Sequence, residues 1–138
     1  DEMAFTENEK ESFLLKIIEM YSSFPTDNHH YRLYFQPILF KALLLTGGVE
    51  MLKDFAFKNG GNNPEAFEEL ISELKKSGDE RSALEAARTG LNIIPKGSRR
   101  REYIAEYIAE TGRNTANPSL VLEGVREVFY SRMSIDTN

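Results

Sequence analysis

Apolar residues recur every three or four positions along almost the whole chain, which is the spacing of amphipathic helices. Runs that alternate β-branched and polar residues, as strands do, are nearly absent. The pattern therefore predicts an all-α fold of about seven helices. Their approximate ranges are 7–23, 29–45, 49–58, 64–76, 80–93, 98–111 and 118–132. The connections are short, so neighbouring helices should pack antiparallel.

Capping and breaking residues set the expected ends of the first helices. Thr6 and Glu9 form a capping box before the first helix. Phe24-Pro25 should end that helix, and Asp27 or Asn28 should cap the second. Pro37 should kink or split the second helix, and Gly47-Gly48 should close it.

Later in the chain, the segment NGGNNP at 59–64 is the strongest loop signal. We therefore expect N-terminal helices in 1–58, packed on a region of helical hairpins in 64–133, within one domain overall. Ser98 and Asn117 are the expected caps of the sixth and seventh helices.

A repeat of 34 residues is visible in the second half of the chain. The predicted fourth helix reads Phe67-x-x-Leu70-Ile71-x-x-Leu74, and the fifth carries Ala83-x-x-x-Ala87 before Pro95. Four residues recur 34 positions later, with Leu70, Ile71, Leu74 and Gly78 matched by Ile104, Ala105, Ile108 and Gly112. We expect the two glycines to mark equivalent turns, and small residues including Gly90 to let helices approach closely.

The segment KSGDERSALEAARTGLNIIPKG resembles one tetratricopeptide repeat. This resemblance implies helix pairs stacked as a short right-handed superhelix that binds a peptide or helix of a partner. By repeat position it implies a groove lined by Glu65, Glu68, Ser72, Lys75, Lys76, Arg99, Glu102, Glu106, Ala109 and Glu110. The chain departs from the pattern at Arg101, where an aromatic is usual, and by a four-residue insertion before the last helix. The clamp that grips a terminal carboxylate in some family members is not reproduced.

A fainter resemblance is to helical regions that accompany SWIM-type zinc fingers in prokaryotic proteins. It rests on GLNIIPKGSRRREYIAEYIAETG and NPSLVLEGVREVFYSRMS. Such a finger needs Cys ligands, and this chain has no cysteine, so any finger would lie outside it.

Composition narrows the function classes. The chain has 138 residues and a net charge of −5, so it has no general attraction for nucleic acid or an anionic membrane. The lack of cysteine excludes disulfides and thiolate sites within it, and no apolar run approaches the ~20 residues of a membrane span. We expect a cytoplasmic protein with no membrane partner.

Candidate chemical sites are few. His29-His30 is the only histidine pair; adjacent helical residues diverge, so we expect no metal site and no cofactor. Glutamates on the helices, such as Glu68 and Glu106, fit a solvated face better than acid–base catalysis. Tyr103 and Tyr107 are expected to pack against the last helix, with an interface role as the alternative.

One basic cluster stands out, Lys96 with Arg99, Arg100 and Arg101, which could bind an anion at a helix N-terminus. The expected function is a non-enzymatic protein-interaction domain, a scaffold or adaptor. The alternatives are a nucleic-acid-associated accessory domain that uses this cluster, and self-association as a homodimer.

Overall fold

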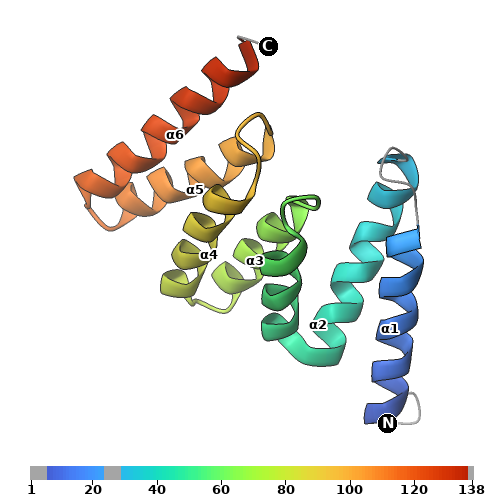
Figure 1. Ribbon diagram of the computed structural model, residues 1–138. Coiled ribbons are helices and arrows are strands. Elements are labelled where there is room, and N and C mark those ends of the chain that lie inside the picture. The colour runs from blue at the N-terminus through green and yellow to red at the C-terminus, as the bar shows by residue number, and fades with distance from the viewer. Residues whose placement is uncertain (1–5, 24–28, 137–138) are drawn as a thin grey trace. The chain divides into compact units, whose positions relative to one another are not determined.

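The computed structural model describes residues 6–23 and 29–136. Six helices form the described chain, and none of these residues is in a strand (Figure 1). Their bounds are α1 Glu7–Ser23, α2 His29–Asn59, α3 Glu65–Lys76, α4 Glu80–Ile93, α5 Arg100–Asn114 and α6 Pro118–Asp136. The all-α prediction is therefore confirmed.

The chain divides into two compact units, Asp1–Leu52 and Lys53–Asn138. In the first unit, α1 begins with the predicted capping box. Glu9 N–H donates to Thr6 Oγ1 at 3.1 Å, and Thr6 N–H donates to Glu9 Oε1 at 3.4 Å. A buried hydrogen bond from Gln36 Nε2 to Tyr21 Oη, 3.0 Å long, joins α2 to α1. The expected helix end at Phe24-Pro25 and the caps at Asp27 or Asn28 lie outside the described residues.

Six helices are found instead of seven because α2 covers both of the predicted ranges 29–45 and 49–58. Gly48 lies inside it with φ 69° and ψ −160°, so the helical path is broken there as the glycine pair predicts. The predicted split at Pro37 is wrong, since Gly48 is the position in α2 with non-helical angles. A proline removes one hydrogen bond and kinks a helix more often than it ends it.

The described part of α2 also corrects the statement that no apolar run is long enough for a membrane. Its segment Tyr34–Asn59 is long and apolar enough to cross one, with a mean hydropathy of 1.3. A core helix of a soluble protein passes the same test, and a third of this window is buried inside the protein. Length and composition alone therefore leave the cytoplasmic location a prediction.

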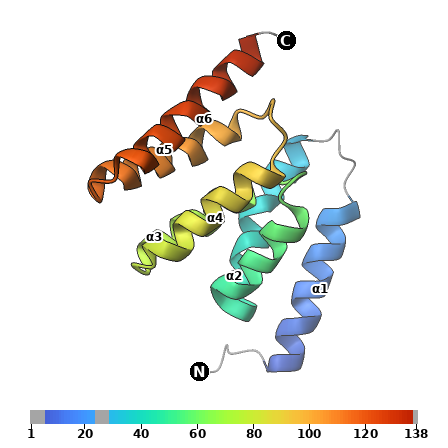
Figure 2. The same cartoon turned by 60° about the vertical axis from the view of Figure 1, so that its left-hand side comes forward.

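The second unit holds α3 to α6 around an apolar core. α3 lies beside α4, and α5 lies beside α6, in both views (Figures 1 and 2). The core residues with the least exposed surface come from α3, α4 and α5, and they include most of the positions that the 34-residue repeat singled out: Phe67, Leu70, Ile71, Ala83, Ala87, Ile104, Ala105 and Ile108. The hydrophobic periodicity of these helices therefore identified the core correctly.

The turns after α3 and α5 are built alike, but they are 38 residues apart. Gly78 and Ala116 both have positive φ, at 80° and 53°. The following residues, Asp79 and Asn117, each donate a backbone N–H five residues back, to Leu74 O and Gly112 O. The same two side chains cap the next helices, at Ser82 N and Leu120 N. The cap predicted at Asn117 is thus confirmed.

Gly112 is therefore not the partner of Gly78, and the expectation that both glycines mark turns is wrong. Gly112 lies inside α5, whose later end delays the turn to Thr115–Asn117. The four-residue insertion that the sequence shows before the last helix falls in this extra helical turn. A shift of four residues keeps the same helix face inward, so the apolar pattern alone could not locate it.

Gly112 and Gly124 instead allow α5 and α6 to approach closely. A Cβ on Gly112 would lie 2.6 Å from Val121 N, and one on Gly124 would lie 2.5 Å from Ala109 N. Both distances are shorter than real Cβ contacts, so only glycine fits without a shift of backbone. Small residues at helix crossings were expected from Gly90, Ala83 and Ala87, and the tightest crossing is found one helix pair later.

Candidate functional site

The residues of the predicted groove lie on α3 and at the start and middle of α5, and most of their charges are paired with one another. Arg100 forms ion pairs with Glu65 at 3.4 Å and with Glu68 at 3.0 Å. Glu102 accepts from Arg132 of α6 at 2.6 Å. These pairs join helices within the second unit, so the groove prediction stays a prediction and its charges are less available than the sequence implies.

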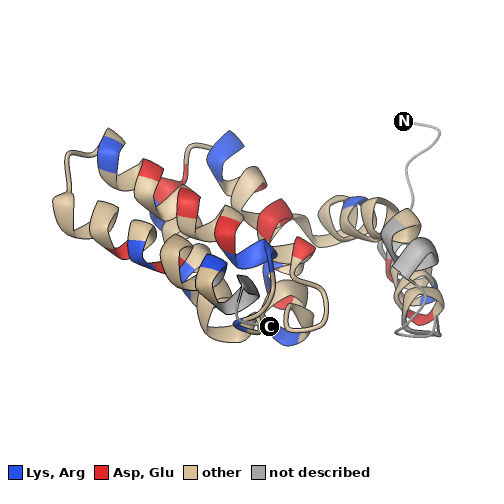
Figure 3. Cartoon of the chain, turned by 90° about the horizontal axis from the view of Figure 1, so that it is seen from above, with Lys and Arg blue, Asp and Glu red and all other residues tan. Residues whose placement is uncertain are grey.

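On α3, Lys76 pairs with Glu73 at 3.1 Å, one turn away. Lys75 places its ammonium 5.2 Å from the centre of the Tyr107 ring, a cation–π distance. Glu106 is exposed on α5. Charges of both signs are interspersed over α3 to α6 (Figure 3).

Burial and an ion pair act in opposite directions on Glu68. Burial raises the pKa of this carboxyl above its ordinary value, while the charge and hydrogen bond of Arg100 lower it, and the balance is an increase. Removing the Arg100 charge would therefore raise the pKa of Glu68 further.

The basic cluster at the start of α5 is divided between the interior and the surface. Arg101 is buried, and its Nη1 donates to Leu91 O at 2.5 Å and to Ile94 O at 2.7 Å. Its Nη2 pairs with Glu127 of α6 at 3.2 Å. Arg101 thus ties the end of α4 and the middle of α6 to the start of α5, in the position where the repeat usually has an aromatic.

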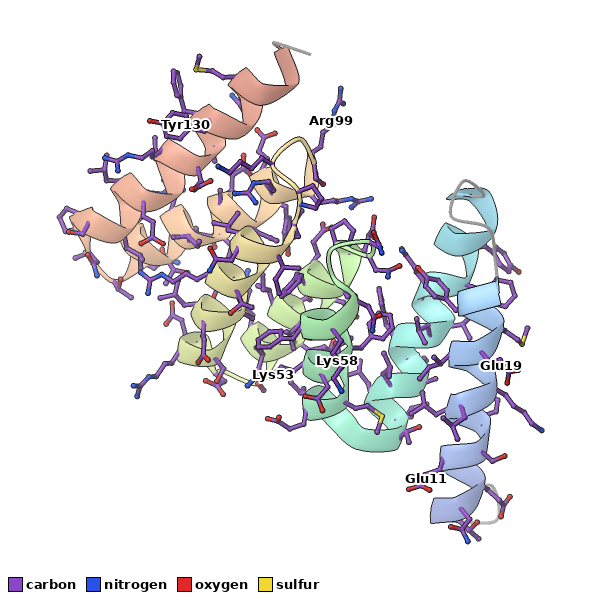
Figure 4. All side chains as sticks on the ribbon, viewed as in Figure 1. Glu11, Glu19, Lys53, Lys58, Arg99 and Tyr130 are labelled. Carbon is purple, nitrogen blue, oxygen red and sulfur yellow. The ribbon has the colours of Figure 1, made fainter. Side chains whose placement is uncertain are left out.

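The other members of the cluster are exposed. Lys96 lies in the α4–α5 connection, and the Arg99 side chain points away from the helices (Figure 4). Ser98 Oγ accepts the backbone N–H of Arg100 at 3.2 Å, although Arg99 is the residue that precedes α5. With Arg100 and Arg101 engaged internally, the four cations do not form one anion site in the described chain.

The outer face of α6 is the feature that sequence reasoning missed. Five large apolar or aromatic side chains on this helix are about half exposed: Leu122, Val125, Phe129, Tyr130 and Met133. Tyr130 projects from α6 on the side away from α5 (Figure 4). We call this surface the α6 stripe. The sequence suggested that Val125 and Phe129 would be covered by Tyr103 and Tyr107, and their exposure shows that this expectation is wrong.

The two tyrosines lie instead beside the carboxylates of α3, α4 and α5. Tyr103 is 42% exposed. Burial raises its pKa, and Glu68, Glu110 and Glu69 raise it further. Negative charge therefore gathers around an aromatic side chain that solvent can reach.

Metal-binding side chains do not cluster among the described residues, where no group of three His, Asp or Glu side chains is close enough to hold an ion. The side chains of His29 and His30 lie outside this description. Comparison with family models, with curated proteins and with solved structures finds no match. The resemblance to tetratricopeptide repeats therefore rests on the sequence spacing and the paired helices described above.

Proposed function

We propose that this chain is a protein-interaction module that binds an amphipathic helix of a partner protein on the α6 stripe. The observation that carries the proposal is the exposure of these five side chains along one helix. Exposed apolar clusters of this kind are uncommon on the free surface of monomeric proteins and are typical of interaction sites.

The spacing of the stripe suits a helix as the ligand. Leu122, Val125, Phe129 and Met133 follow one another at intervals of three or four residues, so they form one ridge along α6. Eleven residues at 1.5 Å each make this ridge about 17 Å long. A partner helix of about three turns would cover it by placing its own apolar residues between these side chains.

Charge next to the stripe favours a partner with acidic flanks over a second copy of this chain. Arg126 is exposed within the stripe, whereas the neighbouring Glu123 and Glu127 are already paired with Arg88 and Arg101. Two copies of α6 facing each other would bring two Arg126 cations together and offer them no unpaired carboxylate on this helix. An acidic partner helix would supply the missing charge.

We further infer that the second unit is a stack of two antiparallel hairpins, α3–α4 and α5–α6, of the tetratricopeptide type. The matching turns at Gly78 and Ala116 support this inference. So does Gly90 near the end of α4, where a Cβ would lie 3.1 Å from Phe67 near the start of α3 and 3.2 Å from Ile104 of α5. In such a stack the last helix lacks a covering neighbour, and α6 is that helix.

Selection of helical peptides from a display library tests the proposal. The library is selected on the wild-type protein and then screened on a Val125→Glu/Phe129→Glu variant. The matched control is Leu45→Glu, which replaces an equally exposed apolar residue of the other unit. We expect apolar peptides with acidic flanks that bind the wild type and the control but not the α6 variant. Peptides that bind all three equally would refute the assignment of the site.

A further inference from the structure

A small open cavity lies between the end of α3, the α3–α4 turn and the second half of α5. Its volume is about 220 Å³, below the range of about 300–1,000 Å³ that suits drug-sized ligands. It is therefore sized for a single side chain. The lining includes Lys75, Glu80, Tyr107, Glu110, Thr111 and Asn114.

The floor of this cavity carries an unsatisfied hydroxyl. Tyr107 is 6% exposed and Thr111 is 4% exposed, so both are buried beneath the rim. Within the described chain, Tyr107 Oη is the one buried side-chain oxygen or nitrogen with no hydrogen-bond partner. Buried polar atoms nearly always have a partner, so an orphan beside a cavity indicates that a ligand atom completes it.

Charge around the cavity favours a cationic ligand. Glu80 and Glu110 stand on the rim and are exposed, against the single ammonium of Lys75. Burial is the largest cause that raises the pKa of Tyr107; the Thr111 side chain opposes it, and the charges of Glu80 and Glu110 add to it. The phenol oxygen therefore faces negative charge, although Lys75 lies over its ring.

We propose that this cavity receives an arginine side chain of a partner peptide, whose guanidinium donates to Tyr107 Oη and pairs with Glu80 and Glu110. A guanidinium has five N–H donors in a plane, so one group can reach a hydroxyl and two carboxylates together. The ammonium of lysine is a compact charge with no such fork, so it would satisfy fewer of these acceptors. This inference rests on the proposed function, since it assumes a peptide partner.

The experiment is a titration of the full chain followed by ¹⁵N–¹H NMR, with N-acetyl-arginine methylamide as the probe. The citrulline analogue is the matched neutral probe, and the glutamate analogue tests for an anion site. Tyr107→Phe and Glu110→Gln remove one contact each. Glu85→Gln is the control variant, because Glu85 is exposed on α4 and does not line the cavity. Preserved spectra away from the cavity verify that each variant is folded.

We expect saturable shifts of the Gly78, Thr111 and Asn114 amides with the arginine probe. Affinity should fall at least fivefold in Tyr107→Phe and in Glu110→Gln, and less than twofold in Glu85→Gln. Equal shifts with citrulline, stronger shifts with the glutamate analogue, or no shifts at all would overturn the arginine assignment. The peptide test on the α6 stripe is scored separately, so its result distinguishes failure of this cavity from failure of the interaction function.

Discussion

Exchanging glycine and alanine between the two equivalent turns should move stability in opposite directions. Gly78 has φ 80° and Ala116 has φ 53°, so both occupy the left-handed region that an L side chain adopts at a cost. Ala116→Gly should therefore stabilise the fold, and Gly78→Ala should destabilise it. Ala116 is exposed, and a Cβ on Gly78 would meet nothing within 4 Å, so packing contributes little to either change.

The magnitude follows from two opposing terms. A side chain in the left-handed region costs about 1–2 kcal/mol. Glycine in the same place loses more freedom on folding, which offsets about 0.5–1 kcal/mol of that gain. The net change in the free energy of unfolding should be about 0.5–1 kcal/mol in each case, positive for Ala116→Gly and negative for Gly78→Ala. For a unit of this size, that corresponds to roughly 2–8 °C in Tm.

Urea unfolding followed by circular dichroism at 222 nm measures both variants beside the wild type. Equal m-values would show that only the stability has changed. The double variant should unfold close to the wild type, because the two turns are separate and their effects should add. Destabilisation by Ala116→Gly would refute the reasoning, since it would mean that unfolded-chain entropy outweighs the backbone conformation at this turn.

Three further predictions concern the packing of the second unit. Gly124→Ala should destabilise by about 1–2 kcal/mol, because crowding against Ala109 exceeds the gain in helix propensity, whereas Gly97→Ala in open space should change stability by less than about 0.5 kcal/mol; urea unfolding compares the two. Arg101→Ala should cost about 3 kcal/mol by the same measurement, because two backbone carbonyls and Glu127 lose their donor, and an unchanged midpoint would contradict the contacts. Tyr107→Phe should be neutral or stabilise by up to about 1 kcal/mol at pH 7, since it removes an unpaired hydroxyl. The raised pKa of Tyr107 means that the wild type should lose stability as the pH rises above 10, and the variant should lose less in a pH series of thermal unfolding.

Most of the fold could be predicted from the sequence because each helix carries its own periodic pattern and end signals. The spacing of Phe67, Leu70, Ile71 and Leu74 located the core of α3, and all four are buried. The capping box at Thr6 and the cap at Asn117 form the expected hydrogen bonds. These features depend on residues a few positions apart, so the sequence contains them directly.

The features that sequence reasoning missed depend on contacts between distant segments. Arg101 looked like part of a surface cation cluster, yet its partners Leu91, Ile94 and Glu127 lie on other elements, and their geometry decides its burial. The helical period is also unchanged by four added residues, so Gly112 was matched to the wrong turn. Whether Phe129 is covered depends on which helices follow in space, and a periodic pattern does not specify that.

The most direct test of the central claim is the affinity of a selected helical peptide for three proteins, measured by fluorescence anisotropy: the wild type, Phe129→Glu and Leu45→Glu. Phe129 and Leu45 are both more than half exposed, so neither change should unfold the protein. The account predicts at least a tenfold weaker affinity for Phe129→Glu and less than a twofold change for Leu45→Glu. Equal affinities for all three proteins would contradict the claim that α6 is the interaction surface.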